Sequence, residues 1–346
     1  MTTSQSPVEI KPPAVSPAAG DSSSQHLSAM LSTIGPILGL FLIFVLFSVL
    51  QPKTFLTLDN LQIILLNTAV VGTAALGATI IIISGGIDLS VGSNIAMCTV
   101  IIALCRLHGA SPLVSILIGI LSSAAVGLLI GVLVTQLNLS SFIVTLGLWG
   151  AVRGFAKWLA AGTVIYAPSG WVSKLLHMLG PGQHWMIVPP GVWLLIVLTF
   201  FVAGVLRFTR FGRHIFAIGS NEQTARLCGV RVVRTKLYIF IFATFFAGVA
   251  GVLQFSYLNN LGDPTTANGY ELNAIASVVI GGASLSGGKG SVFGTLIGAL
   301  LMARVANGCS QFPTISNAVQ DMVTGGIIVA AAAFDRFRQP TQAAAK

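Results

Sequence analysis

Apolar segments about as long as a lipid bilayer is thick recur along almost the whole sequence, and they constrain the fold more than any other feature. A helix needs about 20 apolar residues to cross the hydrocarbon core. The fifth segment is weaker because it carries Arg153 and Lys157, and the eighth is short and ends in glycines. We therefore expect an all-α polytopic membrane protein with about ten transmembrane helices. The expected spans are residues 34–50, 61–83, 91–108, 112–134, 139–161, 189–206, 237–258, 271–282, 291–308 and 315–334.

Charged residues are too scarce for a water-soluble surface. They make up 8% of the 346 residues, and the mean hydropathy is +0.89, whereas soluble domains carry roughly a quarter charged residues. Much of the exterior must then face lipid. The net charge of +9 does not indicate a nucleic-acid partner, because the basic residues are not spread over a soluble face.

The distribution of Lys and Arg predicts that both chain termini are cytoplasmic, because basic residues concentrate in cytoplasmic loops. This orientation places twelve basic residues inside and three outside, and an even number of crossings agrees with it. The cytoplasmic set is Lys11, Arg207, Arg210, Arg213, Arg226, Arg231, Arg234, Lys236, Lys289, Arg336, Arg338 and Lys346. The external set is Lys53, Arg106 and Lys174, and Arg153, Lys157 and Arg304 fall within spans.

We expect one membrane domain between two tails. Residues 1–30 are rich in Ser, Pro and Ala without an apolar core beside a basic start, which predicts a disordered cytoplasmic tail rather than a cleaved signal peptide. Residues 31–335 form the transmembrane domain, including a cytoplasmic loop at 207–236, and residues 336–346 form a second tail. The cysteines and histidines lack disulfide or metal-ligand spacing, so no metal site is expected.

Two similar glycine-rich segments interrupt the apolar pattern. Residues 84–93 read SGGIDLSVGS and residues 281–291 read GGASLSGGKGS. Glycine clusters break helices and let backbones pack closely, as transporters require at discontinuous helices. The pair indicates a duplicated architecture around one pathway, and two unrelated glycine-rich turns remain the alternative. The candidate helix-break or gating residues are Gly85, Gly86, Asp88, Ser90, Gly281, Gly282, Gly287 and Gly288.

Charged residues in or beside the spans have two open interpretations each. Asp88 precedes the third span, where a carboxylate caps the helix N-terminus, and the alternative is an ion relay or a substrate contact. Arg153 and Lys157 lie four residues apart on one helical face. They either extend to the membrane interface or face an aqueous vestibule that meets a negatively charged partner.

The loop at 207–236 holds seven basic residues against one acid, Glu222, and is too polar for the bilayer. Ser220 is in position to cap a short helix, with Gln223 three residues later, and Gly229 supplies its C-terminal stop. A helix of about two turns is marginal alone in water. It therefore packs either on a cytoplasmic partner protein or on its own membrane domain, with Ala225 and Leu227 as contacts.

No nucleotide-binding or catalytic signature is present. The segment around Lys289 departs from the phosphate-binding loop at both ends, because Ala283 replaces its first glycine and Gly290 follows the lysine. Nucleophile elbows and metal-protease helices are also missing from the sequence. Transport without covalent chemistry is the simpler account, and we expect this chain to bind no cofactor.

Four sequence segments resemble those of the membrane subunits of ribose-type ABC importers. They are GGIDLSVGS (85–93), FIVTLGLWGAVRG (142–154), AIGSNEQTARLCGV (217–230) and ELNAIASVVIGGASLSGGKGSVFGTLIGALL (271–301). The resemblance covers about residues 35–334. It implies the ABC importer permease fold, in a homodimer or a heterodimer with a paralogue, in the inner membrane of a bacterium.

The resemblance also implies the partners and a coupling element. The partners are a cytoplasmic ATPase with two nucleotide-binding cassettes, which binds ATP with magnesium, and a periplasmic sugar-binding protein. The loop at 217–230 is the element that docks on the ATPase, and Arg153 also matches the family pattern. The candidate coupling residues are Ala217, Gly219, Ser220, Asn221, Glu222, Ala225 and Gly229.

A sugar path should offer amides and hydroxyls without strong charge, because sugars are neutral and rich in hydrogen-bonding groups. A secondary transporter is the first rival interpretation, and it needs carboxylates at mid-membrane depth, where only Asp88 and Asp321 are candidates. A membrane-embedded enzyme is the second, and it needs a cluster of His, Asp or Glu that the sequence lacks. The candidate pathway residues are Asn67, Asn94, Thr145, Arg153, Gln254, Asn273 and Ser277.

Overall fold

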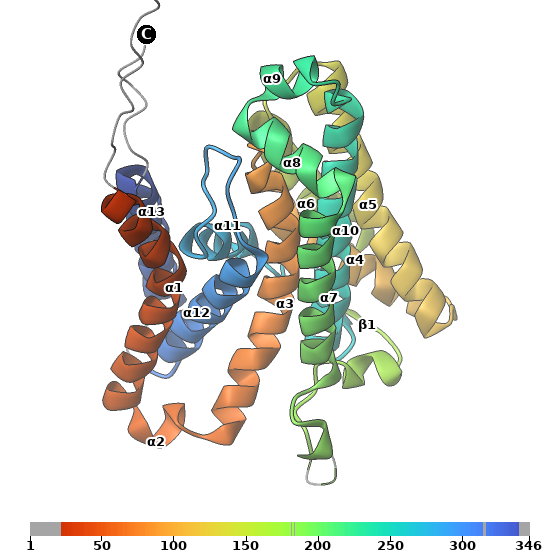
Figure 1. Cartoon of the computed structure of the whole chain (residues 1–346). Helices are drawn as coiled ribbons and strands as arrows, with labels where there is room; N and C mark the ends of the chain where they lie inside the picture. Colours follow the sequence, from red (N-terminus) through yellow and green to blue (C-terminus); the bar gives the residue numbers. More distant parts are fainter. Residues whose placement is uncertain (1–21, 181, 183, 314–315, 339–346) are drawn as a thin grey trace, which may run out of the picture.

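The computed structural model describes residues 22–180, 182, 184–313 and 316–338, and helices dominate it (Figure 1). One helix corresponds to each expected span, so the predicted all-α membrane fold is confirmed. These helices are α1 (Ser22–Leu50), α3 (Leu58–Ile83), α4 (Val91–Leu107), α5 (Pro112–Gln136), α6 (Ser141–Leu159), α7 (Pro190–Phe208), α10 (Val232–Tyr257), α11 (Tyr270–Ile280), α12 (Val292–Ser310) and α13 (Asn317–Arg338).

Shorter elements connect these helices. The short helices are α2 (Pro52–Phe55), α8 (Arg210–Ser220) and α9 (Glu222–Leu227), together with two 3-10 turns at Trp171–Lys174 and His184–Met186. Strands β1 (Ile165–Tyr166) and β2 (Leu261–Gly262) pair antiparallel and join the α6–α7 connection to the segment after α10. Helix α1 begins inside the range expected for the N-terminal tail, whose residues 1–21 lie outside the described residues, as do residues 339–346 of the C-terminal tail.

Among the described residues, helix length and composition separate five membrane-crossing candidates from helices with shorter apolar stretches. Helices α3, α5, α7, α10 and α12 are long and apolar enough to cross a membrane, and α1, α4, α11 and α13 contain shorter apolar stretches. Helix α11 has 11 residues, which cover about 16 Å, roughly half of a hydrocarbon core. The segment expected as the eighth span is therefore a half-helix that ends inside the protein.

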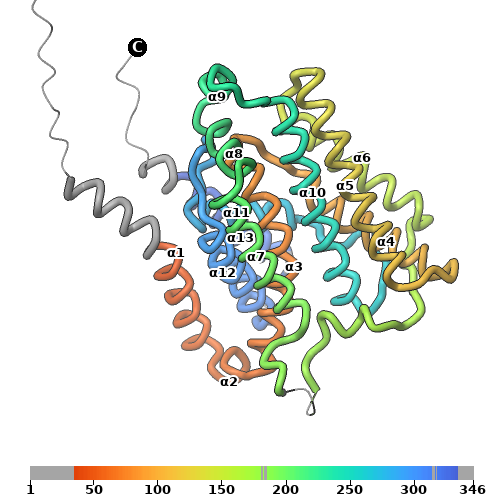
Figure 2. Tube along the Cα trace, turned by 45° about the vertical axis from the view of Figure 1, so that its right-hand side comes forward, coloured from red at the N-terminus to blue at the C-terminus, as the bar shows by residue number. Residues whose placement is uncertain are grey.

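Helix α3 is the centre of the bundle. Every residue from Thr68 to Ile83 is buried, and α10, α12, α11 and α7 pack around it (Figures 1 and 2). An apolar residue buried by neighbouring helices rather than by lipid gains dispersion contacts from close packing. Helix α3 thus joins the first part of the chain to the last helices.

Glycines allow α5 to approach α10 closely. A Cβ atom on Gly127 would lie 2.5 Å from the carbonyl oxygen of Phe240, and one on Gly131 would lie 2.7 Å from Leu237 Cδ1. The two glycines are four residues apart and share one helix face, which is the spacing that lets membrane helices pack backbone to backbone. Any larger side chain there would force the two helices apart.

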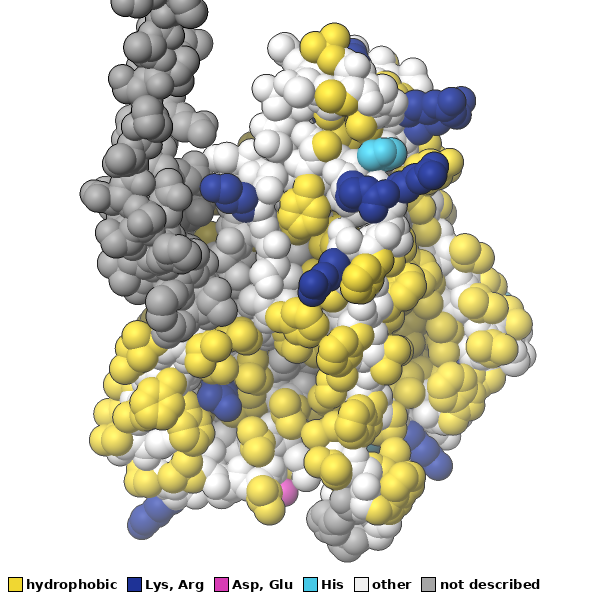
Figure 3. Space-filling view, viewed as in Figure 1, with side chains coloured by type: hydrophobic (Ala, Val, Ile, Leu, Met, Phe, Trp, Pro, Cys, Tyr) yellow, Lys and Arg dark blue, Asp and Glu magenta, His cyan; other side chains and the backbone are white. Residues whose placement is uncertain are grey.

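On the face shown in Figure 3, apolar side chains form a broad belt over the lower part of the molecule, and basic side chains gather above it near α8 and α9. Helices α1, α5 and α7 contribute exposed large apolar side chains to the belt. A soluble monomer rarely exposes so extensive an apolar surface, so the belt is the face that lipid covers. Representative members are Phe41, Leu42, Val49, Leu117, Leu121, Val197, Phe200 and Phe201.

Candidate functional site

Helices α8 and α9 form a polar cap at one end of the bundle (Figure 1). The short helix expected in this loop is present as α9, but the prediction that Ser220 caps it is wrong. Ser220 is the last residue of α8, and the Oδ1 atom of Asn221 accepts a hydrogen bond from the Thr224 amide at 2.9 Å. Both residue types cap well, and Asn221 has the extended backbone (φ −160°) that an N-cap requires.

Gly229 ends α9, as the sequence predicts. Its φ of +83° is the left-handed conformation that glycine adopts without strain. The amide of the next residue, Val230, donates to the carbonyl of Ala225 at 3.0 Å, which satisfies a carbonyl at the helix end. The chain then turns directly into α10.

Helix α9 has one face on its own domain and one face exposed. Ala225 is buried in a cluster with Ile218 and Val232, whereas Leu227 is 88% exposed. Glu222 ties the helix to α10 through Lys236 Nζ at 2.6 Å, with Arg226 Nη2 at 3.5 Å on the other side. The two interpretations of this helix are thus compatible, because the packed face fixes it and the exposed face is available to a partner.

Three glycine-containing segments meet beneath the polar cap, at what we call the glycine junction: residues 83–85, 219–220 and 287–288. The amide of Gly288 donates to the carbonyl of Ile83 at 2.8 Å. A Cβ atom on Gly219 would collide with that same carbonyl and would lie 2.6 Å from the Gly288 nitrogen. A Cβ atom on Gly287 would lie 2.7 Å from the Gly219 carbonyl oxygen and 3.0 Å from Gly85.

The glycine junction therefore joins both glycine-rich segments of the pseudo-repeat to the C-terminal end of α8. Gly85, Gly287 and Gly288 all have positive φ angles, between +74° and +86°, as the predicted helix breaks require. Gly282 also has a positive φ of +90°, where α11 ends. Beside the junction, a cavity of about 350 Å³ extends from Ser84 to Lys236 and Glu222. Backbone packing this close transmits displacement directly, because no flexible side chain intervenes.

Asp88 lies in the connection between α3 and α4 and does not cap α4 as expected. Its Oδ1 atom accepts hydrogen bonds from the amide (2.7 Å) and the hydroxyl (2.6 Å) of Ser90, and Ser90 is the N-cap residue of α4. Among the described residues, Asp88 Oδ2 has no hydrogen-bond partner although Asp88 is buried. The carboxylate therefore shapes the turn that leads into the helix rather than the first turn of the helix itself.

Arg153 is buried and reaches across to the segment that precedes α11. Its Nη1 atom donates to the carbonyls of Thr266 (2.5 Å) and Pro264 (3.2 Å). A Cβ atom on Gly92 would contact the Glu271 carboxylate and would lie 3.4 Å from Arg153 Nη2. Because Gly92 on α4 has no side chain, Arg153 of α6 and Glu271 of α11 can both lie next to it. Arg153 therefore extends into the bundle rather than to the membrane interface.

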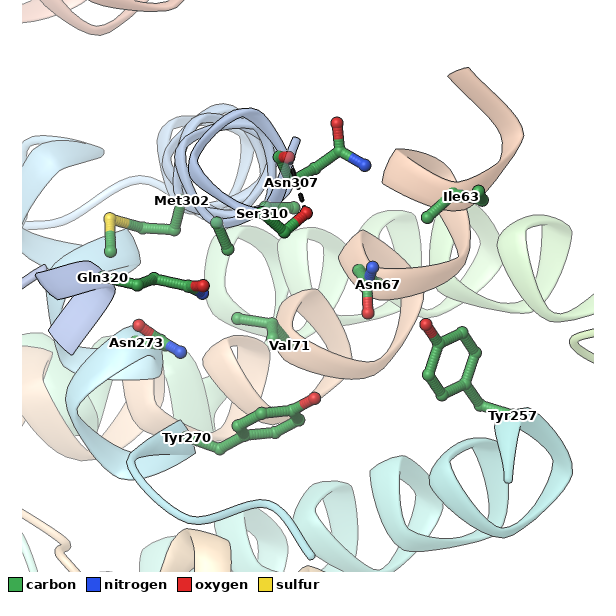
Figure 4. A pocket seen from close by; sticks show the side chains of 12 residues that line it. Ile63, Asn67, Val71, Tyr257, Tyr270, Asn273, Met302, Asn307, Ser310 and Gln320 are labelled. Atoms are coloured by element: carbon green, nitrogen blue, oxygen red, sulfur yellow. Dashed lines mark hydrogen bonds between the residues drawn. The ribbon is translucent and has the colours of Figure 1, made fainter. Parts of the chain in front are cut away.

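A neutral, polar cavity of about 280 Å³ lies between α3, α10, α11, α12 and α13, and we call it the amide pocket (Figure 4). The side chains of Asn273 and Gln320 lie on one side of it in Figure 4, and Asn67 and Tyr257 lie on the other. Among the described residues, none that lines it is charged. The lining residues are Ile63, Asn67, Val71, Tyr257, Tyr270, Asn273, Met302, Ala303, Ala306, Asn307, Ser310 and Gln320.

The pocket lies far from the glycine junction. Asn67 precedes Ile83 by 16 residues on the same helix, which corresponds to about 24 Å along its axis. The polar cap therefore lies at the C-terminal end of α3, and the amide pocket lies beside the N-terminal half of the same helix. Any coupling between the two must run along α3 or along α11 and α12.

Two candidate pathway residues, Asn67 and Asn273, line the amide pocket, and the structure places the others elsewhere. Gln254 Nε2 donates to Thr266 Oγ1 at 2.8 Å, and Ser277 Oγ donates to the Asn273 carbonyl at 2.6 Å. Asn94 Nδ2 donates to Ser90 Oγ at 3.2 Å, and Thr145 Oγ1 donates to the Ile87 carbonyl at 3.3 Å. These four side chains stabilise turns and helix contacts in the bundle.

Five polar residues of the pocket were not predicted from the sequence: Tyr257, Tyr270, Asn307, Ser310 and Gln320. Asn307 and Gln320 are amides within expected spans, so the criterion that selected Asn67 and Asn273 would also have selected them. Tyr257 and Tyr270 lie at helix ends, where an aromatic residue is common in any membrane protein, and no sequence signal marks them. In the described part of the chain, no group of His, Cys, Asp and Glu is arranged to hold a metal ion.

Comparison with known proteins identifies the family. Residues 60–332 match a family described as "Branched-chain amino acid transport system / permease component". The chain is 35% identical to the ribose import permease protein RbsC of Bacillus subtilis, over 90% of this chain and 95% of that protein. It is 33% identical to the L-arabinose ABC transporter permease protein AraH of Azospirillum brasilense (92% and 91%) and to the D-allose transport system permease protein AlsC of Escherichia coli (86% and 89%). No solved structure matches it.

Proposed function

The chain belongs to the family of transport permease components whose model matches residues 60–332, and we propose that it is the membrane subunit of an ATP-driven importer of a monosaccharide. Curated relatives that match nearly its full length are ribose, arabinose and allose permeases by name. The lining of the amide pocket is the observation that favours a sugar over an amino acid as the transported molecule. Amino acids are considered because the family's description names them.

A neutral sugar fits the amide pocket better than an amino acid does. Asparagine and glutamine offer both donors and acceptors, which match the hydroxyl groups of a sugar. An amino acid carries an ammonium and a carboxylate, and burying such charges without charged or dipolar partners is costly. In the part of the chain that the structure describes, the pocket lining has no charged side chain, so a monosaccharide is the cargo that this lining favours.

The polar cap supports an ATP-driven mechanism with a separate ATPase. Leu227 is exposed at the tip of α9 among Arg226, Arg231 and Arg234, which are also exposed. An exposed leucine within a charged surface is the kind of anchor that a partner's apolar cleft accommodates. The proposed partner is a cytoplasmic ATPase with two nucleotide-binding cassettes, which carries ATP and magnesium, so this chain binds no cofactor.

The remaining assignments follow from this orientation. With the polar cap in the cytoplasm, the basic cluster around α8 and α9 satisfies the positive-inside rule, and both termini are cytoplasmic in a bacterial inner membrane. The opposite end, with the amide pocket, then faces a periplasmic sugar-binding protein. A second permease subunit, identical or paralogous, completes the complex, since one ATPase with two cassettes provides two docking sites.

In the proposed cycle, ATP binding moves the ATPase against the polar cap. The glycine junction passes this displacement to the segments at 84–90 and 281–291 together, because α8 contacts both. The bundle then alternates between outward and inward access by a rigid-body switch between two packed arrangements. The energy comes from ATP rather than from an ion gradient, and neither Asp88 nor Asp321 lines the amide pocket.

Leu227→Asp tests the docking face. We expect the variant to insert normally and to lose the ATPase during purification in mild detergent, because a carboxylate would be buried in an apolar cleft. Leu58→Asp is the matched control, since Leu58 is 77% exposed at the opposite end of the bundle. Retention of a stoichiometric ATPase by the Leu227 variant, or purification of the wild-type chain without any ATPase, would refute the proposal.

A further inference from the structure

The strongest unassigned feature is the amide pocket, whose polar side chains are not used by the fold. Among the described residues, no hydrogen bond engages the side-chain amides of Asn67, Asn273 and Gln320 or the hydroxyls of Tyr257 and Tyr270. Elsewhere in the bundle, the hydroxyls of Thr73, Thr79 and Thr199 are hydrogen-bonded to backbone carbonyls of their own helices. Polar groups held in a membrane protein without protein partners are a functional feature by default.

We infer that the amide pocket is a binding site for a single monosaccharide within one permease subunit. This inference rests on the proposed function and adds the site. Its volume of about 280 Å³ is close to the lower end of the 300–1,000 Å³ that small-molecule sites occupy. A cavity at the small end of this range favours a monosaccharide over a larger sugar.

The lining has the two kinds of surface that a sugar needs. Asn67, Asn273, Gln320 and Asn307 contribute amides from four separate helices, so hydroxyl groups on several sides of a sugar ring find donors or acceptors. Tyr257 and Tyr270 add aromatic rings with hydroxyl groups, which cover the apolar face of a ring while keeping a polar end available. The described lining residues carry no formal charge that would retain the cargo.

The helices that line the pocket also explain how its occupancy changes during transport. Asn273 is on the half-helix α11, which ends at Gly281 and leads into the glycine-rich segment of the junction. Asn67 is on α3, which ends at the junction through Ile83. A displacement at the junction therefore moves two walls of the pocket relative to each other, which weakens a site that depends on amides from both.

Cysteine protection in lipid nanodiscs tests the site without relying on uptake. The variant Ala306→Cys places a thiol in the pocket lining, in a chain whose Cys98, Cys105 and Cys309 are replaced by alanine. The exposed native Cys228, on the polar cap, stays as the internal control. The probes are D-ribose, L-arabinose and D-allose, with maltose as a disaccharide that is too large and L-leucine as the alternative cargo.

We expect at least one of the three monosaccharides to slow alkylation of Cys at position 306 by threefold or more in a saturable manner, and to leave Cys228 unaffected. In that background, Asn67→Leu and Asn273→Leu should each raise the half-protecting concentration by about three- to tenfold, as the loss of one or two hydrogen bonds implies. Gln136→Leu is the matched control, because Gln136 is an exposed amide at the end of α5, outside the pocket.

Three results would overturn the inference, and they are distinguishable. If the assembled wild-type complex imports a monosaccharide but no sugar protects position 306, the site is refuted and the proposed function stands. If the complex imports none of the three sugars and L-leucine protects position 306, the cargo assignment and the sugar site both fail. Equal protection by maltose would also refute a site of this size.

Discussion

The glycine junction makes Gly219→Ala the most informative single substitution. A methyl group at Gly219 collides with the Ile83 carbonyl and lies 2.6 Å from the Gly288 nitrogen. Both obstacles are backbone atoms, so neither can move aside by changing a side-chain rotamer. The collision also disrupts the hydrogen bond between Gly288 and Ile83, which is 2.8 Å long.

The cost of this substitution follows from two terms. Overpacking a dense site costs about 1–3 kcal/mol, and a lost backbone hydrogen bond costs about 0.5–1.5 kcal/mol. A penalty of about 2–4 kcal/mol on the arrangement described here shifts the balance between two transport states by at least about thirtyfold. We therefore expect uptake to fall at least tenfold, while the chain still inserts and still retains the ATPase.

Uptake of radiolabelled monosaccharide into proteoliposomes measures the effect, with ATP hydrolysis recorded in parallel. Gly204→Ala on α7 is the matched control, because a Cβ atom there meets nothing within 4 Å and the gain in helix propensity is the same. The expected variant hydrolyses ATP without sugar-dependent stimulation. Wild-type uptake by both variants would show that the close contact at Gly219 carries no coupling, and the reasoning would be refuted.

Further substitutions test three other features. Gly229→Val should reduce uptake severely with insertion intact, because a β-branched residue is strained at φ +83°; normal uptake would contradict the role of this turn in positioning α9. Asp88→Asn should keep uptake within twofold and leave the melting temperature equal or higher, since an amide oxygen can still accept both bonds from Ser90; loss of uptake in a folded variant would instead establish a charge-dependent role. Gly127→Leu should prevent folding, because a leucine there forces apart two helices, α5 and α10, that pack backbone to backbone. Gly150→Leu, at an open position, should fold, and fluorescence size-exclusion chromatography in detergent measures both variants.

The sequence predicts individual elements of this protein better than the relations among them. Long apolar runs determine helices such as α3 and α10 because the bilayer imposes a length, and Gly229 ends α9 because its local chemistry suffices. The N-cap was displaced by one residue because Ser220 and Asn221 are both good caps and only the end of α8 distinguishes them. Local signals thus carry errors of about one residue.

Sites built from distant segments are harder to predict. The sequence marks Gly85, Gly219 and Gly288 in three separate contexts, and nothing in it shows that their backbones meet. The amide pocket has the same character, since Asn67 and Gln320 become neighbours only because α13 packs near α3 through α11 and α12. Which helix faces meet depends on packing across the whole bundle, so residues such as Asn94 satisfied the same polar criterion yet lie outside the pocket.

The short length of α11 has a consequence for how the protein is made. Its 11 residues are too few to cross the hydrocarbon core, which takes about 20, and the acid Glu271 in its first turn adds to the cost of insertion. Helix α12 is long and apolar enough to insert by itself. During synthesis, α11 must therefore remain in the translocon until α12 has emerged from the ribosome, and the two must pass into lipid together as a helical hairpin.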